Sequence, residues 1–106
     1  MQKKLKNISY YILPIIILFS QNIKADEKLD IGKEIFLGKG TCALCHTLAD
    51  AGSEASVGPN LNEIVPDMMR VMHVVRNGNG VMLAYEGQVT NEEIEAVSYY
   101  VSESTK

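Results

Sequence analysis

The chain has 106 residues, with ten Lys and Arg against thirteen Asp and Glu, which gives a formal net charge of −3. This length allows one small domain rather than several. An acidic balance argues against nucleic acid as a partner, because phosphate binding needs an excess of basic side chains. A domain of this size usually needs a disulfide, a metal or a cofactor to complete its core.

The N-terminus predicts a secretory signal peptide over residues 1–25. Three lysines among the first six residues precede a mostly apolar stretch over 8–19, which is shorter than the roughly 20 residues that span a bilayer. Cleavage after Ala25 would leave a mature domain over 26–106, with six basic and thirteen acidic side chains. The expected location is a bacterial periplasm. The alternative is an uncleaved N-terminal segment that tethers the protein to the membrane.

The mature region predicts short helices joined by loops, and no sustained two-residue alternation indicates strands. Asp30 is the expected N-cap of a first helix that runs to Phe36. The remaining expected elements, in chain order, are a loop over 50–60, a helical turn over 61–64, a helix over 67–76 that follows Pro66, and a final helix that begins with a capping box of Thr90 and Glu93. The fold class is therefore expected to be all-α.

The sequence Cys42-Ala43-Leu44-Cys45-His46 has the spacing C-x-x-C-H, which is the attachment signature of a c-type haem. Two thiols about one helical turn apart can add to the two vinyl groups on one edge of a haem. The histidine that follows can then bind the iron through a ring nitrogen. The motif predicts one covalently bound haem c, held by Cys42 and Cys45, with His46 as an axial iron ligand.

Three other interpretations of the cysteine pair are possible. A structural zinc site needs four ligands, and the second histidine lies 27 positions beyond His46, which is far outside zinc-site spacing. An exported thiol–disulfide redox protein that uses Cys42 and Cys45 is the stronger alternative, although no strand pattern precedes the motif. A structural disulfide is disfavoured because two residues between the cysteines make a poor link.

The second axial iron ligand has several candidates in the sequence. Met82 is favoured, because it lies in a glycine-rich loop that can fold close to a flat ring. The other candidates share one predicted helix, where methionine more often fills a core; they are His73, Met68, Met69 and Met72. A His/Met pair would fill both axial positions and restrict the site to moving one electron.

Together these features resemble the small monohaem class I cytochromes c of bacteria. Gly32 and Phe36 are similar to the family's first-helix positions that pack on the last helix, and residues 57–61 resemble its G-P-x-L stretch. The resemblance implies three to five short helices around one haem, and it implies that the carbonyl of Pro59 accepts a hydrogen bond from His46. Residues 75–82 resemble the family's approach to its ligand methionine, except that Leu83 replaces the usual proline.

The resemblance implies an electron-transfer protein rather than an enzyme. Its expected partners are redox proteins such as a dehydrogenase or a terminal oxidase. Residues 76–85 also resemble the cytochrome subunits of periplasmic sulfite dehydrogenases. The protein is therefore expected to be either a free shuttle or the electron-accepting subunit of such an enzyme.

Overall fold

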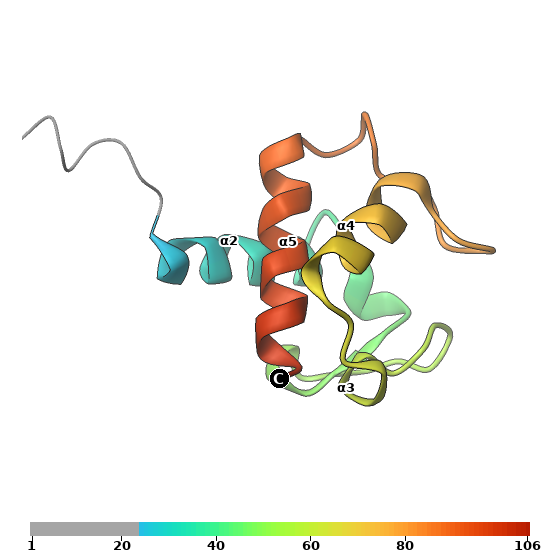
Figure 1. Cartoon of the computed structure of the whole chain (residues 1–106). Coiled ribbons are helices and arrows are strands. Elements are labelled where there is room, and N and C mark those ends of the chain that lie inside the picture. The colour runs from blue at the N-terminus through green and yellow to red at the C-terminus, as the bar shows by residue number, and fades with distance from the viewer. Residues whose placement is uncertain (1–23) are drawn as a thin grey trace, which may run out of the picture.

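The computed structural model describes residues 24–106, and Figure 1 shows the arrangement of their elements. The α-helices are α2 (Ala25–Leu37), α3 (Leu61–Ile64), α4 (Met68–Asn77) and α5 (Asn91–Ser104). The shorter elements are the 3-10 turns η1 (Cys42–Leu44) and η2 (Ala49–Ala51) and the strands β1 (Thr47–Leu48) and β2 (Ser53–Glu54). The expected signal peptide falls almost wholly on residues outside this range. Within residues 24–106, no helix is both long enough and apolar enough to cross a membrane.

The first helix begins earlier than the sequence predicted. α2 starts at Ala25 with Lys24 at its N-cap, so Asp30 is an interior helical residue and the prediction of an Asp30 cap was wrong. No proline or glycine interrupts residues 25–31, and Asp26 and Glu27 complement the positive end of the helix dipole. The helix therefore extends by five residues before the predicted cap. It ends at Leu37, before Gly38.

The terminal helix crosses the first helix at a close contact, as predicted. α5 packs against both α2 and α4 (Figure 1). A Cβ atom on Gly32 would lie 2.2 Å from the carbonyl oxygen of Ala96, so only glycine permits this approach. The rings of Phe36 and Tyr100 meet edge to face, with their centroids 5.9 Å apart. The predicted capping box is present, because the Thr90 and Glu93 side chains each accept from the other's backbone N–H.

The structure differs slightly from two further predictions, the bounds of one helix and the loop over 50–60. α4 spans Met68–Asn77 rather than 67–76, because the carboxylate of Asp67 accepts from the backbone N–H of Arg70 and caps the helix. A small antiparallel pair, β1 and β2, lies inside the region expected to be a loop, with Leu48 opposite Ser53. Two-residue strands are too short to produce a visible alternation, so the sequence could not have indicated them. The turn over 61–64 was predicted correctly.

The core lies where α2, α4 and α5 meet. Its buried apolar side chains form one cluster. They are Ile35, Phe36, Leu48, Val75, Ile94, Val97, Tyr100 and Val101. Phe36, Val75, Val97 and Val101 also form part of the wall of a cavity beside this cluster. The helices thus provide an apolar wall for the site that the loops complete.

Candidate functional site

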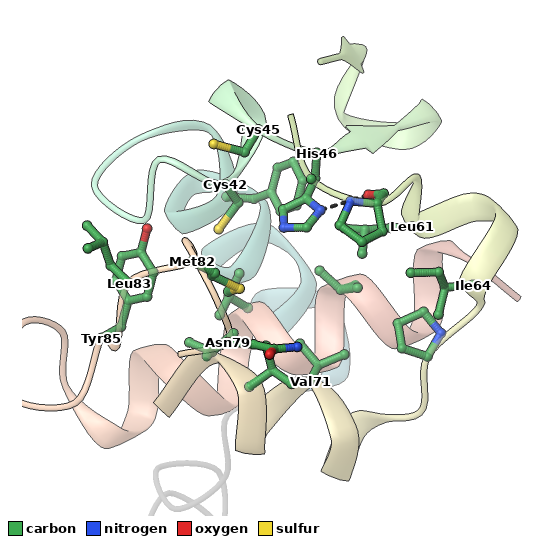
Figure 2. A pocket seen from close by; sticks show the side chains of 18 of the residues that line it. Cys42, Cys45, His46, Leu61, Ile64, Val71, Asn79, Met82, Leu83 and Tyr85 are labelled. Atoms are coloured by element: carbon green, nitrogen blue, oxygen red, sulfur yellow. Dashed lines mark hydrogen bonds between the residues drawn. The ribbon is translucent and has the colours of Figure 1, made fainter. Parts of the chain in front are cut away.

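A cavity of about 390 Å³ lies between the Cys42–His46 segment, the α3 region, α4 and the loop that follows α4. Its lining is predominantly apolar. Figure 2 shows side chains from all of these segments pointing into it, among them Cys42, His46, Ile64, Val71 and Met82. The five residues predicted to hold or orient a haem, Cys42, Cys45, His46, Pro59 and Met82, all line this one cavity.

His46 is held by a main-chain carbonyl. Its Nδ1 lies 2.8 Å from the carbonyl oxygen of Pro59 (Figure 2). A carbonyl can only accept, so Nδ1 donates and carries the proton, and in the neutral imidazole Nε2 is left with a lone pair. A Cβ atom on Gly58 would lie 2.7 Å from Cε1 of His46, so the chain passes tightly against the ring. The imidazole is therefore fixed in the tautomer that a metal ligand needs.

Cys42 is the first residue of the 3-10 turn η1, and Cys45 is its C-cap. The backbone N–H groups of Cys45 and His46 both donate to the carbonyl of Cys42, at 3.1 and 2.9 Å, which winds the motif into a compact turn. Both cysteines are free. Burial raises the pKa of the Cys42 thiol to about 11. A raised pKa disfavours the reactive thiolate at Cys42.

Met82 reaches the cavity from a tight loop. Gly78 adopts φ +77°, and a Cβ atom there would lie 2.7 Å from the carbonyl oxygen of Met82, so the turn requires glycine at this position. Asn79 and Met82 exchange two backbone hydrogen bonds. The N–H of Asn79 donates to the carbonyl of Met82 at 3.2 Å, and the N–H of Met82 donates to the carbonyl of Asn79 at 3.0 Å. In Figure 2 the Met82 side chain points into the cavity from a different wall than His46.

The competing ligand candidates do not reach this cavity. His73, Met68, Met69 and Met72 are all helical residues of α4, as predicted, but none of them lines the site. His73 is exposed and lies 3.3 Å from the side-chain amide of Asn77. Met69 is 74% exposed. Met82 is therefore the candidate that shares a cavity with His46.

Several lining residues were missed by the sequence reasoning. Thr41, Arg70, Asn79 and Tyr85 are polar lining residues that were not proposed as site residues, although Asn79 and Tyr85 lie in the stretch 76–85 that carries the resemblance. The apolar wall could have been found, because Val71, Val74 and Val75 recur at helical spacing and place their side chains on one face of α4.

The residues of this cavity fit a covalently bound haem. The lining is predominantly apolar, as a porphyrin ring requires, and the two free thiols lie beside an imidazole whose Nδ1 bonds to Pro59, so that Nε2 is the nitrogen available to a metal. Gly58 passes so close to the imidazole ring of His46 that no side chain fits between them. Met82 supplies a thioether from another segment. Thiols, imidazole and thioether are the donor set of a haem c site.

Comparison with known proteins decides the family. The family model described as "Cytochrome C oxidase, cbb3-type, subunit III" matches residues 27–101. The chain belongs to this cytochrome c family. It is a small monohaem cytochrome c with the class I fold, and it carries a covalently bound haem c. It is accordingly an electron-transfer protein that works with redox partner proteins.

Two relatives agree with this assignment. The cytochrome is 34% identical to cytochrome c6 of Bryopsis maxima over 83 residues, a match that covers 69% of this chain and 88% of the relative. Its structure is similar to that of the c-type cytochrome SorU from Sinorhizobium meliloti, with a TM-score of 0.70 and 55% identity. That match covers 74% of this chain and 91% of SorU.

Proposed function

We propose that this cytochrome is a one-electron carrier whose haem iron has two protein ligands, His46 and Met82. Cys42 and Cys45 form the thioether bonds. The observation that supports this ligand pair best is that Met82 lines the same cavity as His46, whereas the four competing side chains of α4 do not. The bound haem supplies the chemistry, since its iron alternates between the ferric and ferrous states.

The protein's own residues set the conditions for this exchange. Pro59 keeps the proton of His46 on Nδ1 and fixes the ring, because its carbonyl accepts the hydrogen bond. The Met82 thioether favours the ferrous state and raises the reduction potential. If His46 and Met82 both bind the iron, it would have no free position for a substrate. The cytochrome therefore performs no bond-making reaction of its own.

The rim of the cavity is the proposed docking surface. Val57, Val81 and Leu83 line the cavity, and their side chains are 73, 91 and 68% exposed. An apolar rim of this kind suits brief contact with a redox partner, since small interfaces dissociate quickly. Ala43, beside the first cysteine, is half-buried and adds to it. The acidic excess of residues 26–106 favours a partner with an electropositive patch.

The proposed location is the periplasm, reached through cleavage of the N-terminal segment near Ala25. The partner is a dehydrogenase or a terminal oxidase. The resemblance of residues 76–85 to cytochrome subunits of sulfite dehydrogenases supports a role as the electron-accepting subunit of such an enzyme, and a free shuttle is the second candidate. Co-purification from the native periplasm separates them. A dehydrogenase that stays bound to the cytochrome supports the subunit, and a haem protein that elutes alone supports the shuttle.

The ligand assignment is tested with Met82→Ala in the holo-cytochrome. The weak near-infrared sulfur-to-iron band of the oxidised protein should disappear and the reduction potential should fall, because the thioether no longer stabilises ferrous iron. Met72→Ala is the matched control, because Met72 lies on α4 away from the cavity and should leave the band intact. A band that survives in Met82→Ala would mean that another residue is the ligand.

A further inference from the structure

The loop that presents Met82 is fixed to its own wall of the cavity by main-chain hydrogen bonds. At its C-terminal end, the N–H of Tyr85 donates to the carbonyl of Val75 at 2.9 Å, and the N–H of Glu86 donates to the carbonyl of Arg76 at 3.3 Å. Val75 and Arg76 both belong to α4, the helix that leads into the loop. These bonds close the loop on α4, but they do not hold it against the opposite wall that carries His46.

Packing holds Met82 on one side only. Met82 is partly buried and packs against the core cluster, whereas its neighbours Val81 and Leu83, at the rim of the cavity, are 91 and 68% exposed and bury little apolar surface. The loop also contains Gly78 and Gly80, both with positive φ, which leave its backbone free to adopt other conformations. A contact between this loop and the segment that carries His46 would therefore stabilise the thioether inside the cavity.

One side-chain hydrogen bond supplies that contact. The hydroxyl groups of Thr41 and Tyr85 lie 3.0 Å apart. Thr41 immediately precedes Cys42, so this bond joins the segment that carries the thiols and His46 to the loop that carries Met82. Thr41 donates its own proton to the carbonyl of Gly40 at 2.7 Å, which leaves its oxygen to accept from Tyr85. Within the described part of the chain, it is the side-chain hydrogen bond that links residues 40–46 to residues 78–85.

Thr41 itself has a strained backbone. Thr41 adopts φ 54° and ψ 19°, a left-handed conformation that is unfavourable for a β-branched residue. Glycine would adopt it without strain but has no hydroxyl group. The fold thus tolerates a strained residue at the position from which a hydroxyl group reaches Tyr85.

We propose that Tyr85 and Thr41 are positioning residues, and that their hydrogen bond is a clasp that holds Met82 in the cavity as an iron ligand. The proposal rests on the proposed function, since it takes Met82 as that ligand. The clasp acts on the equilibrium between the state with Met82 bound and the state with Met82 released. Its loss should populate the released state without changing the ligands themselves.

Imidazole titration of the oxidised holo-cytochrome measures this equilibrium, because added imidazole binds the iron only where Met82 has left it. Tyr85→Phe removes the hydroxyl group and keeps the ring, and it should raise the affinity for imidazole by about two- to tenfold, the range for one lost hydrogen bond. Tyr99→Phe is the matched control. Tyr99 lies on α5, does not line the cavity, and should leave the affinity unchanged.

Substitutions at Thr41 separate positioning from general stability. Thr41→Gly relieves the left-handed strain, so its thermal midpoint should not fall, yet its affinity for imidazole should rise as in Tyr85→Phe. Thr41→Ser keeps the hydroxyl group and should match the wild type. The double variant of Thr41→Gly and Tyr85→Phe should bind imidazole no more tightly than either single variant, because the two residues share one bond.

The outcomes distinguish the clasp from the ligand assignment. If the wild type shows the sulfur-to-iron band, Met82→Ala removes it, and Tyr85→Phe binds imidazole with wild-type affinity, the clasp is overturned and the ligand assignment stands. Fully additive effects of Thr41→Gly and Tyr85→Phe would also overturn it. If the band persists in Met82→Ala, the ligand assignment fails and the clasp fails with it.

Discussion

The hydroxyl group of Tyr100 donates a 2.7 Å hydrogen bond to Oδ2 of Asp50 and so links helix α5 to turn η2. Asp50 also lies 3.5 Å from the ammonium group of Lys33 on α2. The Tyr100 hydrogen bond, followed by Lys33, lowers the pKa of Asp50. Burial and the same carboxylate raise the pKa of Tyr100. Three segments of the fold therefore meet at one carboxyl group.

Tyr100→Phe should lower the free energy of unfolding by about 1 kcal/mol, the usual net value of one intramolecular hydrogen bond. The ring is retained, so its edge-to-face contact with Phe36 persists and little apolar packing is lost. Denaturant unfolding of the holo-cytochrome measures the change. Tyr99→Phe removes a hydroxyl group elsewhere on α5 and should have almost no effect. Equal losses in the two variants would contradict the role of Asp50.

The stability gained from Tyr100 and Asp50 should depend on pH at both extremes. The pKa of Asp50 is lowered in the fold, so its contribution is present above the unfolded value of 3.8 and is lost as the pH falls further. The pKa of Tyr100 is raised, so its contribution is present below 10.0 and is lost as the pH rises further. The difference in unfolding free energy between wild type and Tyr100→Phe should therefore be constant near neutrality and shrink at both ends.

Gly58→Ala should disturb the His46 ring. The added Cβ atom would lie 2.7 Å from Cε1 of the imidazole, so the ring or the chain has to move. Overpacking of this kind costs about 1 to 3 kcal/mol. The expected result is a lower haem content per polypeptide and a shifted reduction potential. Ser56→Ala changes an exposed residue of the same loop and is the control. A wild-type potential in Gly58→Ala would show that His46 is not tightly held.

Gly32→Ala should destabilise the crossing of α2 and α5 by about 1 to 3 kcal/mol, because its Cβ atom would lie 2.2 Å from the carbonyl oxygen of Ala96. Asp30→Ala on the same helix should change the stability by less than about 0.5 kcal/mol, since Asp30 is exposed and interior to the helix. Thermal unfolding of both variants provides the test. If Asp30→Ala lowered the stability by about 1 kcal/mol, the value typical of a capping residue, Asp30 would be the N-cap after all.

Without haem the chain should fold poorly. The cavity of about 390 Å³ then lies beside the core with no apolar group to fill it, and its lining is left exposed to water. Circular dichroism of a variant with both Cys42→Ser and Cys45→Ser, prepared free of haem, should show much less helix than the holo-cytochrome. A cooperative unfolding transition with native helix content in that variant would contradict this expectation.

Local sequence signals predicted the parts of the fold that depend on a few neighbouring residues. The capping box at Thr90 and Glu93 and the turn over 61–64 were correct because both are specified by short spacings. The start of α2 was wrong because an aspartate that resembles an N-cap can equally occupy an exposed helical position. The one sequence feature that separates these two positions is that no helix-breaking residue lies just before Asp30.

The predicted site was incomplete for a different reason. Cys42, Cys45 and His46 form a contiguous motif, and their shared cavity with Pro59 and Met82 agrees with the expected constellation, although their roles as ligands stay predictions. Thr41 and Tyr85 are 44 positions apart in the chain and meet only in the folded structure. No spacing rule joins two such residues, so sequence reasoning could not find them.

The separation of His46 and Met82 along the chain couples folding to the oxidation state. His46 follows the two haem-attachment cysteines directly, so it would stay near the iron even in an unfolded chain. Met82 lies 36 residues further along the chain, so it would reach the iron only when α3 and α4 have folded. Under the proposed ligation, the thioether prefers ferrous iron and is bound only in the native state. Ferrous protein should then be more resistant to denaturant than ferric protein, by the free energy that corresponds to the difference in reduction potential between the folded and unfolded chains.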